Sequence, residues 1–204
     1  LLYWATSCGE CAGGCGLAAK TADNRLIKLE GIPEHPINKG KLCARGHSAI
    51  QDVYHPSRVK DLTGEWSEVL AGLAKQMDPA QKPLWVVKDL HGSRGALMVE
   101  LAKKAGAKIW VTGYPDSITE RRVMKAIYGK AELPLYKLEE SDYAVSFGGD
   151  FLNNGTSPVY NGWGYGQFRR GRDRLRGTYV AVGSRMNMSS ANSDKWLAVR
   201  PGTE

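Results

Sequence analysis

Residues 8–16 read Cys8-Gly9-Glu10-Cys11-Ala12-Gly13-Gly14-Cys15-Gly16, and this short segment decides the fold of the first part of the chain. It holds three of the four cysteines in the sequence, and the fourth, Cys43, follows after a long interval. The spacing is C-x2-C-x3-C-x27-C, and no cysteine occurs after it. Four thiols gathered in one short region indicate a covalent or metal-bound site.

Three kinds of site use four cysteines, namely disulfides, zinc and an iron–sulfur cluster. A disulfide framework is usually spread over a small secreted domain, whereas structural zinc usually takes two paired cysteine knuckles or a histidine pair. A tight triplet with one distant partner is typical of a four-iron cluster. The pattern therefore predicts a [4Fe–4S] cluster, with zinc and disulfides as the alternatives. The predicted ligands are Cys8, Cys11, Cys15 and Cys43.

The residues between the third and fourth cysteines predict a small β structure. Residues 17–20 and 25–30 have the character of two strands, and Ala22-Asp23-Asn24 forms the turn between them. The segment Gly31-Ile32-Pro33-Glu34-His35-Pro36 is a rigid loop that returns the chain to Cys43, with His35 fixing a turn or contacting the cofactor. Glycines in the cysteine loop allow the backbone to wrap a cluster closely. We expect a mostly β cluster domain over residues 1–62.

Residues 63–204 predict the beginning of a doubly wound α/β domain with a largely parallel sheet. Helical and strand-like segments alternate along the chain, which is typical of parallel sheets with helical crossovers. Ser117 is the expected N-cap of one helix, with Glu120 completing a capping box. Trp85, Trp110 and Trp196 are expected in strands as core residues. The expected helices cover residues 66–77 and 94–105 and begin again at 117, and the strands cover 84–87, 108–113, 143–147 and 179–182, with another near 196–199.

Composition is ordinary for a globular protein. Of the 204 residues, 42% are hydrophobic and 24% charged, and the net charge is +7. The basic residues are scattered, apart from the arginines between 169 and 176, and no nucleic-acid signature accompanies them. No apolar run approaches the roughly 20 residues of a membrane span. The sequence does not open with Met, and we expect it to be part of a longer chain whose targeting segment lies elsewhere.

Several motifs together resemble one family. They are the loop Cys8–Gly16, the stretch KLEGIPEHPINKGKLCARG at residues 28–46, and Tyr54-His55-Pro56-Ser57-Arg58. In this order they are similar to the N-terminal cluster domain of the molybdopterin oxidoreductases, the dimethyl sulfoxide reductase family. Residues 146–152 and 196–204 resemble two further signatures of that family. The resemblance implies the N-terminal part of an enzyme's catalytic subunit, whose 4Fe-4S cluster relays electrons to or from a molybdenum bis(pterin guanine dinucleotide) site.

The resemblance also implies roles for individual residues. A basic residue two positions after the last cysteine lies between cluster and pterin in the family, and Arg45 stands at that position. The alternative is that Arg45 pairs with a nearby carboxylate. Gly148-Gly149-Asp150 follows a strand and is expected to contact the dinucleotide part of the cofactor. The arginines between 169 and 176 face either its diphosphate or solvent. The expected cofactor-binding residues are Gly148, Gly149, Asp150, Asn153 and Arg185, with Asn154 and Thr156 as further polar contacts.

Two departures from the family pattern support a second hypothesis. Gly183-Ser184-Arg185 stands where the family commonly has an acidic residue, Pro and Arg. No cysteine beyond Cys43 is present to hold molybdenum, and the nearest candidate ligands are Asp116 and Ser117. The alternative is a molybdenum-free electron-transfer or scaffold subunit, of the kind found in alternative complex III or quinone reductase complexes.

Both hypotheses imply the same partners and the same cellular location. We expect the partners to be a membrane quinone-reactive subunit together with an iron–sulfur electron-transfer subunit, and we expect no nucleic acid. The expected place is the periplasmic or extracytoplasmic face, in anaerobic respiration.

Overall fold

A computed structural model of the chain describes residues 1–60, 64–87, 92–112, 115–171 and 175–204, apart from the side chains of residues 81 and 115–117. The chain divides by its contacts into two compact units. The first contains residues 1–54 and 124–204, and the second contains residues 55–123. The predicted domains at residues 1–62 and 63–204 follow the order of the chain rather than its contacts, and they stay a prediction.

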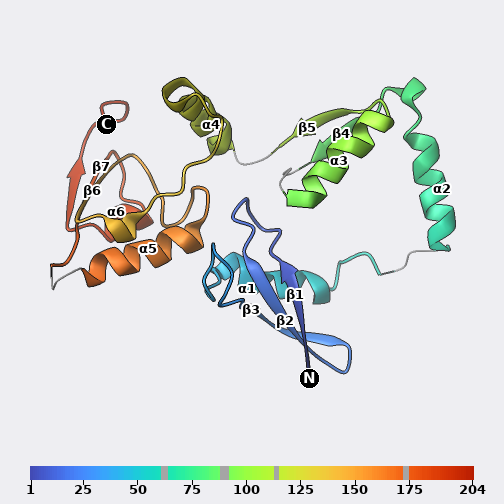
Figure 1. Cartoon of the computed structure of the whole chain (residues 1–204), viewed down its shortest axis with the longest axis horizontal. Helices are drawn as coiled ribbons and strands as arrows, with labels where there is room; N and C mark the ends of the chain where they lie inside the picture. Colours follow the sequence, from blue (N-terminus) through green and yellow to red (C-terminus); the bar gives the residue numbers. More distant parts are fainter. Residues whose placement is uncertain (61–63, 88–91, 113–114, 172–174) are drawn as a thin grey trace. The chain divides into compact units, whose positions relative to one another are not determined.

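The N-terminal part of the first unit is a three-stranded antiparallel sheet (Figure 1). Its strands are β1 (Leu2–Ser7), β2 (Gly16–Ala22) and β3 (Arg25–Gly31). The turn between β2 and β3 places Asp23 and Asn24 at φ 48° and 60°, as a tight two-residue hairpin requires. The two predicted strands are confirmed. Strand β1, which pairs with β2 from Leu2↔Thr21 to Ser7↔Gly16, was not predicted.

The other part of the first unit is a three-stranded parallel sheet of β6 (Tyr143–Phe147), β7 (Thr178–Gly183) and β8 (Lys195–Ala198). Helix α5 (Pro158–Arg170) connects β6 to β7 and packs against the sheet, because Phe168 shares a buried cluster with Tyr179 and Ala181 of β7 (Figure 1). The short elements η2 (Leu138–Glu140) and α6 (Met188–Ala191) complete this part. Trp196 packs at the edge of the same cluster, as predicted.

The second unit contains a parallel pair, β4 (Leu84–Val87) and β5 (Lys108–Val111). Around it lie α2 (Trp66–Gln76), the short η1 (Pro79–Gln81) and α3 (Gly92–Lys104), which ends before Gly106 at φ 58°. Helices and strands alternate with parallel pairing in both units, which confirms the α/β class. The parallel strands form two separate sheets within the described residues.

Two local predictions are wrong. Helix α4 (Pro115–Tyr128) begins two residues before Ser117, so Ser117 lies inside the helix and is not its N-cap. Proline is favoured in the first helical turn because it needs no N–H there. Trp110 is 63% exposed rather than part of the core, since the two-stranded sheet of the second unit leaves this residue uncovered.

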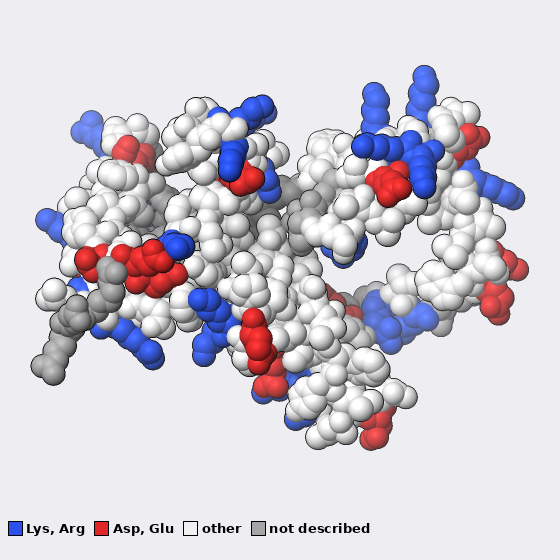
Figure 2. Space-filling model, in the orientation of Figure 1, with Lys and Arg blue, Asp and Glu red and all other residues white. Residues whose placement is uncertain are grey.

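The surface is mixed in charge. Figure 2 shows Lys and Arg side chains distributed among Asp and Glu over the visible face, in keeping with the scattered basic residues of the sequence. Among the described residues, no helix is both long and apolar enough to cross a membrane.

Candidate functional site

The cysteines lie where loops leave the N-terminal sheet. Cys8 directly follows β1, Cys15 directly precedes β2, and Cys11 lies in the loop between them. The Cys8 N–H donates to the Cys15 carbonyl at 2.8 Å, which closes this loop. Cys43 directly precedes helix α1 (Ala44–Tyr54). Antiparallel pairing of β1 with β2 therefore brings the first and third cysteines together, and the β3–α1 loop supplies the fourth.

The four thiols share one environment. Cys8 and Cys15 are buried at 7% and 4% exposure, Cys11 and Cys43 are half-buried, and all four are free of disulfides. Burial raises the pKa of Cys15 to about 11, and the nearby sulfur atoms of Cys11, Cys8 and Cys43 raise it further. Burial likewise raises the pKa of Cys8. A cationic centre bound between such thiols would favour their thiolate forms and offset this effect.

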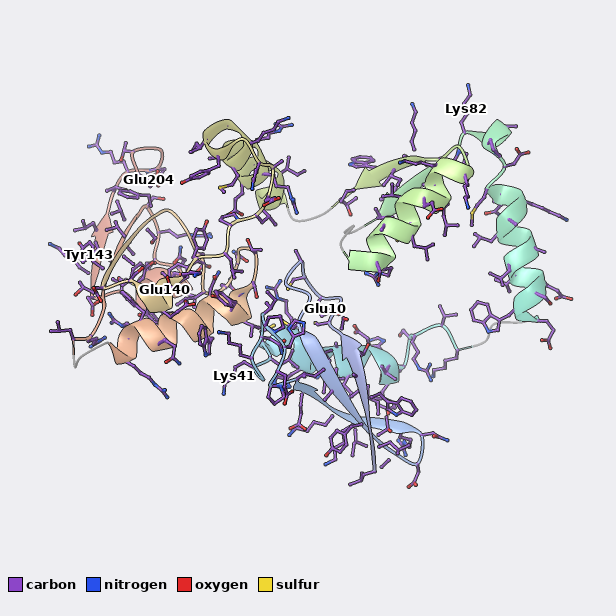
Figure 3. All side chains as sticks on the ribbon, viewed as in Figure 1. Glu10, Lys41, Lys82, Glu140, Tyr143 and Glu204 are labelled. Carbon is purple, nitrogen blue, oxygen red and sulfur yellow. The ribbon has the colours of Figure 1, made fainter. Side chains whose placement is uncertain are left out.

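The donor set fits an iron–sulfur cluster. A four-iron cluster is held by four cysteine thiolates, and glycines between them let the backbone approach closely. The Gly13 N–H donates to Cys11 Sγ at 3.4 Å, a contact of the kind that tunes sulfur ligands. Within the described part of the chain, no three His, Cys, Asp or Glu side chains are placed to hold one metal ion. Figure 3 shows Glu10 in the first cysteine loop and Lys41 in the loop that leads to Cys43.

His35 fixes a turn, as one of its two predicted roles required. Its Nδ1 accepts from the Ile37 N–H at 3.3 Å, and its backbone carbonyl accepts from the Lys39 N–H at 3.0 Å. The imidazole packs on Gly16, where an added Cβ would lie only 2.6 Å from the ring carbon Cδ2. The residue after Cys15 must therefore lack a side chain. This close packing holds the β3–α1 loop against the start of β2.

Helix α5 contributes to the surroundings of the cysteines from far along the chain. Val159 belongs to the same buried cluster as Cys8 and Cys15. The Ser157 hydroxyl accepts from the Tyr160 N–H at 3.3 Å and lies 3.3 Å from the position of a Cβ on Gly13. Sequence reasoning missed this contribution. Ser157-Pro158 is a typical helix start and marks where α5 begins, but nothing in the pattern indicates what the helix packs against.

The predicted cofactor-binding residues lie at the carboxyl ends of the parallel strands. Gly148, at φ 65°, directly follows β6 and donates its N–H to the Val182 carbonyl of β7 at 2.8 Å. The Gly149 carbonyl accepts from Asn187 Nδ2 at 3.4 Å. Asp150 Oδ1 accepts from both the N–H and the hydroxyl of Ser189, at 3.0 and 2.9 Å. The β6 loop and the loop after β7 are thereby joined.

Arg45 connects the cluster domain to these loops. Its Nη2 donates to the Asn153 carbonyl at 3.2 Å, and Asn153 Nδ2 donates to Asp150 Oδ2 at 3.3 Å. The structure thus brings Arg45, Asn153 and Asp150 into one hydrogen-bonded path. Arg185 is exposed in the loop after β7. Beside Gly149 lies a cavity of about 280 Å³, lined by aromatic and aliphatic residues that include Tyr136, Phe147 and Tyr179.

Other predicted residues have different positions. Arg169 donates to the Gly177 carbonyl and to Asp194, and Arg176 Nη2 lies 3.5 Å from Asp194 Oδ1, so these two arginines face a carboxylate. Arg172 and Arg174 lie outside the described residues. The side chains of Asp116 and Ser117, the candidate molybdenum ligands, lie outside the described part of the structure as well. Thr156 donates to the Pro134 carbonyl at 3.2 Å.

Comparison with known proteins agrees with this site. Residues 3–55 match the model of the molybdopterin oxidoreductase Fe4S4 domain. The chain is 23% identical over 207 residues to the menaquinone reductase, molybdopterin-binding-like subunit of Nitratidesulfovibrio vulgaris, which covers 95% of this chain and 30% of that protein. It is 26% identical over 247 residues to a sulfite dehydrogenase subunit from Allochromatium vinosum, covering 98% of this chain and 22% of that protein.

A third relative has a higher sequence identity over a shorter alignment. The alpha subunit of the formate dehydrogenase of Megalodesulfovibrio gigas is 52% identical over 98 residues, covering 42% of this chain and 10% of that protein. The chain thus spans less than a third of the length of these relatives. The match to the domain model includes all four cysteines and the sheet that presents them. Residues 3–55 therefore match the Fe4S4 domain of the molybdopterin oxidoreductases, and the chain as a whole is similar to subunits of oxidoreductases.

Proposed function

We propose that the chain is the N-terminal part of the catalytic subunit of a molybdopterin-dependent oxidoreductase. Cys8, Cys11, Cys15 and Cys43 would hold a [4Fe–4S] cluster that relays electrons to or from a molybdenum bis(pterin guanine dinucleotide) site. The observation that carries this proposal is the gathering of four free thiols at one end of a small sheet within the matched Fe4S4 domain. When bound, the cluster supplies one-electron transfer.

The residues proposed for the pterin cofactor are Arg45, Gly148, Gly149, Asp150, Asn153 and Arg185. Two observations support them. The hydrogen-bonded path from Arg45 through Asn153 to Asp150 leads from the residue two positions after Cys43 to the strand ends. Ligands of parallel sheets bind outside the carboxyl ends of the strands, which is where Gly148 lies. We propose Arg45 as the residue between cluster and pterin.

A second candidate function is a molybdenum-free electron-transfer or scaffold subunit of a quinone-linked respiratory complex. The sequence Gly183-Ser184-Arg185, which lacks the expected acidic residue, favours it. A relative aligned with 95% of the chain is named a molybdopterin-binding-like subunit of a menaquinone reductase. In this case the cluster domain would carry electrons without a second metal site.

Partners are proposed on the same basis. Each of the relatives named above is one subunit of its enzyme. We therefore propose that this protein works in a complex with a membrane quinone-reactive subunit, together with an iron–sulfur electron-transfer subunit. We also propose a periplasmic or extracytoplasmic location.

The cluster is tested by anaerobic purification. We expect iron and acid-labile sulfide in the chain and, after reduction, an electron paramagnetic resonance signal of a [4Fe–4S] cluster. Stoichiometric zinc without iron would refute the cluster. Replacing Cys43 by Ser should lower the iron content, whereas Ser48→Ala, at an exposed position in α1, is the matched control and should leave it unchanged.

The two candidate functions are separated by elemental analysis of the full-length protein. Molybdenum or tungsten together with extracted pterin would establish the first function. A protein that retains its cluster but contains neither metal nor pterin would establish the second.

A further inference from the structure

Asn38 lies in the loop between β3 and α1, and its side chain is completely buried, at 0% exposure. Its amide group makes three hydrogen bonds to the main chain. Asn38 Oδ1 accepts from the Gly16 N–H at 2.9 Å. Asn38 Nδ2 donates to the Gly16 carbonyl at 3.0 Å and to the Lys41 carbonyl at 2.8 Å. All three bonds thus go to the main chain of two residues.

These two residues adjoin two of the cluster cysteines. Gly16 directly follows Cys15, and Lys41 stands two positions before Cys43. The Asn38 amide therefore joins the segment that carries the third cysteine to the segment that carries the fourth. The Cys8–Cys15 pair is already held by a backbone bond at the ends of β1 and β2. For the segment that carries Cys43, the corresponding link is the hydrogen bond from the Asn38 side chain to the Lys41 carbonyl.

The packing around Asn38 fixes its position. A Cβ on Gly31 would lie 2.6 Å from the Lys41 carbonyl oxygen and 2.7 Å from Asn38 Nδ2. Lys39 and Gly40, at φ 45° and 77°, turn the chain so that the Lys41 N–H donates to the Asn38 carbonyl at 2.7 Å. The side-chain amide is thus enclosed by main chain on several sides. A residue of another shape or polarity at position 38 cannot make the same three bonds.

The chemistry of the three bonds specifies an amide. One bond needs an acceptor and two need a donor, and an Asn side chain has both on one planar group. An aspartate of nearly the same shape keeps the acceptor for the Gly16 N–H but presents an oxygen to the two carbonyls. A buried polar group left without its partner loses the hydration it had in the unfolded chain and gains no hydrogen bond in return, which is destabilising. The bridge from Gly16 to Lys41 is therefore sensitive to a change of a single atom.

We infer that Asn38 is a positioning residue that holds Cys43 in place relative to Cys15, so that both reach one cluster. This inference rests on the proposed function, since it assigns Asn38 a role only if the cysteines hold a cluster. Residues that orient metal ligands from the next layer usually change metal affinity about 10- to 100-fold when replaced. Asn38 acts on the cluster through Gly16 and Lys41, without contributing a ligand of its own.

The test compares the full chain with Asn38→Asp after anaerobic purification. We expect iron to pass from the variant to an added ferrous chelator about 10- to 100-fold faster than from the wild type. In the fraction that retains its cluster, the midpoint potential should fall as the pH is raised through the ionisation of the new carboxyl, because a buried carboxylate disfavours the added electron. Asn24→Asp is the matched control. It makes the same chemical change in the exposed β2–β3 turn and should alter neither measurement.

A second control separates positioning from loss of stability. Phe168→Leu removes packing from the other buried cluster of the unit and should lower the unfolding free energy without hastening iron loss. If Asn38→Asp does not fold, Asn38→Ser leaves the two carbonyls without their shared donor and adds no charge. The inference is overturned if the Asn38 variants retain iron as firmly as Asn24→Asp, or if Phe168→Leu releases it as fast at matched stability.

These outcomes are distinguishable from a failure of the proposed function. A wild-type chain that holds no cluster refutes the proposed function, and the inference falls with it. If the wild-type chain holds a cluster and substitution of Asn38 does not change the rate of iron loss, only the inference is refuted.

Discussion

Lys39 Nζ lies 3.5 Å from the centre of the Trp163 ring and 5.7 Å from that of Tyr160. The loop that adjoins the cluster cysteines is therefore attached to helix α5, which begins far later in the sequence. With Val159 and Ser157, these contacts make α5 part of the surroundings of the cluster. The start of α5, residues 157–163, is consequently expected to contribute to the stability of the Fe4S4 domain, whereas Phe168 near the other end of the helix packs on the β6–β8 sheet.

Removing the charge of Lys39 should weaken this attachment. A cation over an aromatic ring at an exposed site contributes about 0.5–1 kcal/mol, so Lys39→Met should lower the unfolding free energy by that amount in urea titrations. Lys20→Met is the control, because Lys20 Nζ lies 5.7 Å from the exposed ring of Tyr3. An equal loss from both variants would show that the Trp163 contact has no particular weight.

Asp194 should make the stability of the first unit depend on pH in the acidic range. Its carboxylate accepts hydrogen bonds from Arg169 and, at 2.8 Å, from the Tyr179 N–H, and these hold its pKa well below the usual range. A group with a lowered folded pKa contributes stability above its unfolded pKa of about 4 and loses that contribution as the pH falls. Unfolding measured between about pH 6 and 2 should show this decline.

Asp194→Asn should reduce the acid dependence and cost about 1–2 kcal/mol near neutral pH, through loss of the charged hydrogen bonds. Asp23→Asn, in the exposed hairpin turn, is the control and should leave the pH profile unchanged. A profile for Asp194→Asn that is as steep as the wild-type profile would contradict the role of this carboxylate.

The Tyr160 hydroxyl donates to Glu139 Oε1 at 2.7 Å and ties α5 to η2. Burial, together with the neighbouring Glu139 carboxylate, raises the pKa of Tyr160 to about 12. Because the folded state keeps this proton longer than the unfolded state, stability should be complete below about pH 10 and decline as the pH rises above it. Tyr160→Phe should reduce this alkaline decline, which unfolding measured from about pH 8 to 12 would show, and the remainder is expected from Tyr165 and Tyr179, whose pKa values burial also raises.

The two partners of this pair should respond differently to substitution. Among the described residues, Glu139 Oε2 is buried without a hydrogen-bond partner. Tyr160→Phe leaves a second carboxylate oxygen without its donor and should cost about 1–3 kcal/mol. Glu139→Gln keeps an acceptor for the Tyr160 hydroxyl and removes a partly buried charge, so it should cost much less. The reverse order of the two unfolding free energies would refute this account.

Gly31→Ala should disturb the Asn38 bridge without changing Asn38. The added Cβ would meet main-chain atoms of Gly40 and Lys41 at 2.6 Å, and such overpacking typically costs about 1–3 kcal/mol. Both the unfolding free energy and the iron content should fall. Gly162→Ala is the matched control, because its Cβ meets nothing within 4 Å on α5, and it should stabilise the helix by about 0.5–1 kcal/mol. Equal effects would contradict the packing argument.

Local patterns predicted much of the fold. The hairpin of β2 and β3, the strand of residues 143–147 and the helix that ends before Gly106 follow from turn chemistry, β-branched content and helical spacing, which act over a few residues. Strand β1 was missed because its six residues are all exposed and do not alternate between apolar and polar. Its strand character comes from pairing with β2, which is not a property of its own sequence.

The candidate site divides in the same way. The four cysteines and Arg45 are predicted by spacing and resemblance, since a cluster imposes fixed intervals on its ligands. The roles of Asn38, Ser157 and Trp163 are not readable from sequence, because each depends on a contact across a long separation in the chain. Asp150 is predicted to contact the cofactor, and the structure adds a contact of its carboxylate with Ser189 that the sequence pattern does not indicate.

The sequence by itself determined that four thiols would be gathered in the N-terminal part and that strands and helices would alternate after them. Only the tertiary structure decided what surrounds the thiols. Antiparallel pairing of β1 with β2 brought Cys8 to Cys15, and the buried Asn38 amide joined Gly16 to Lys41. Val159 of α5 packed into the same buried cluster as Cys8 and Cys15. The physical reason is that ligand identity depends on local chemistry, whereas burial and hydrogen bonding depend on which distant segments the fold brings into contact.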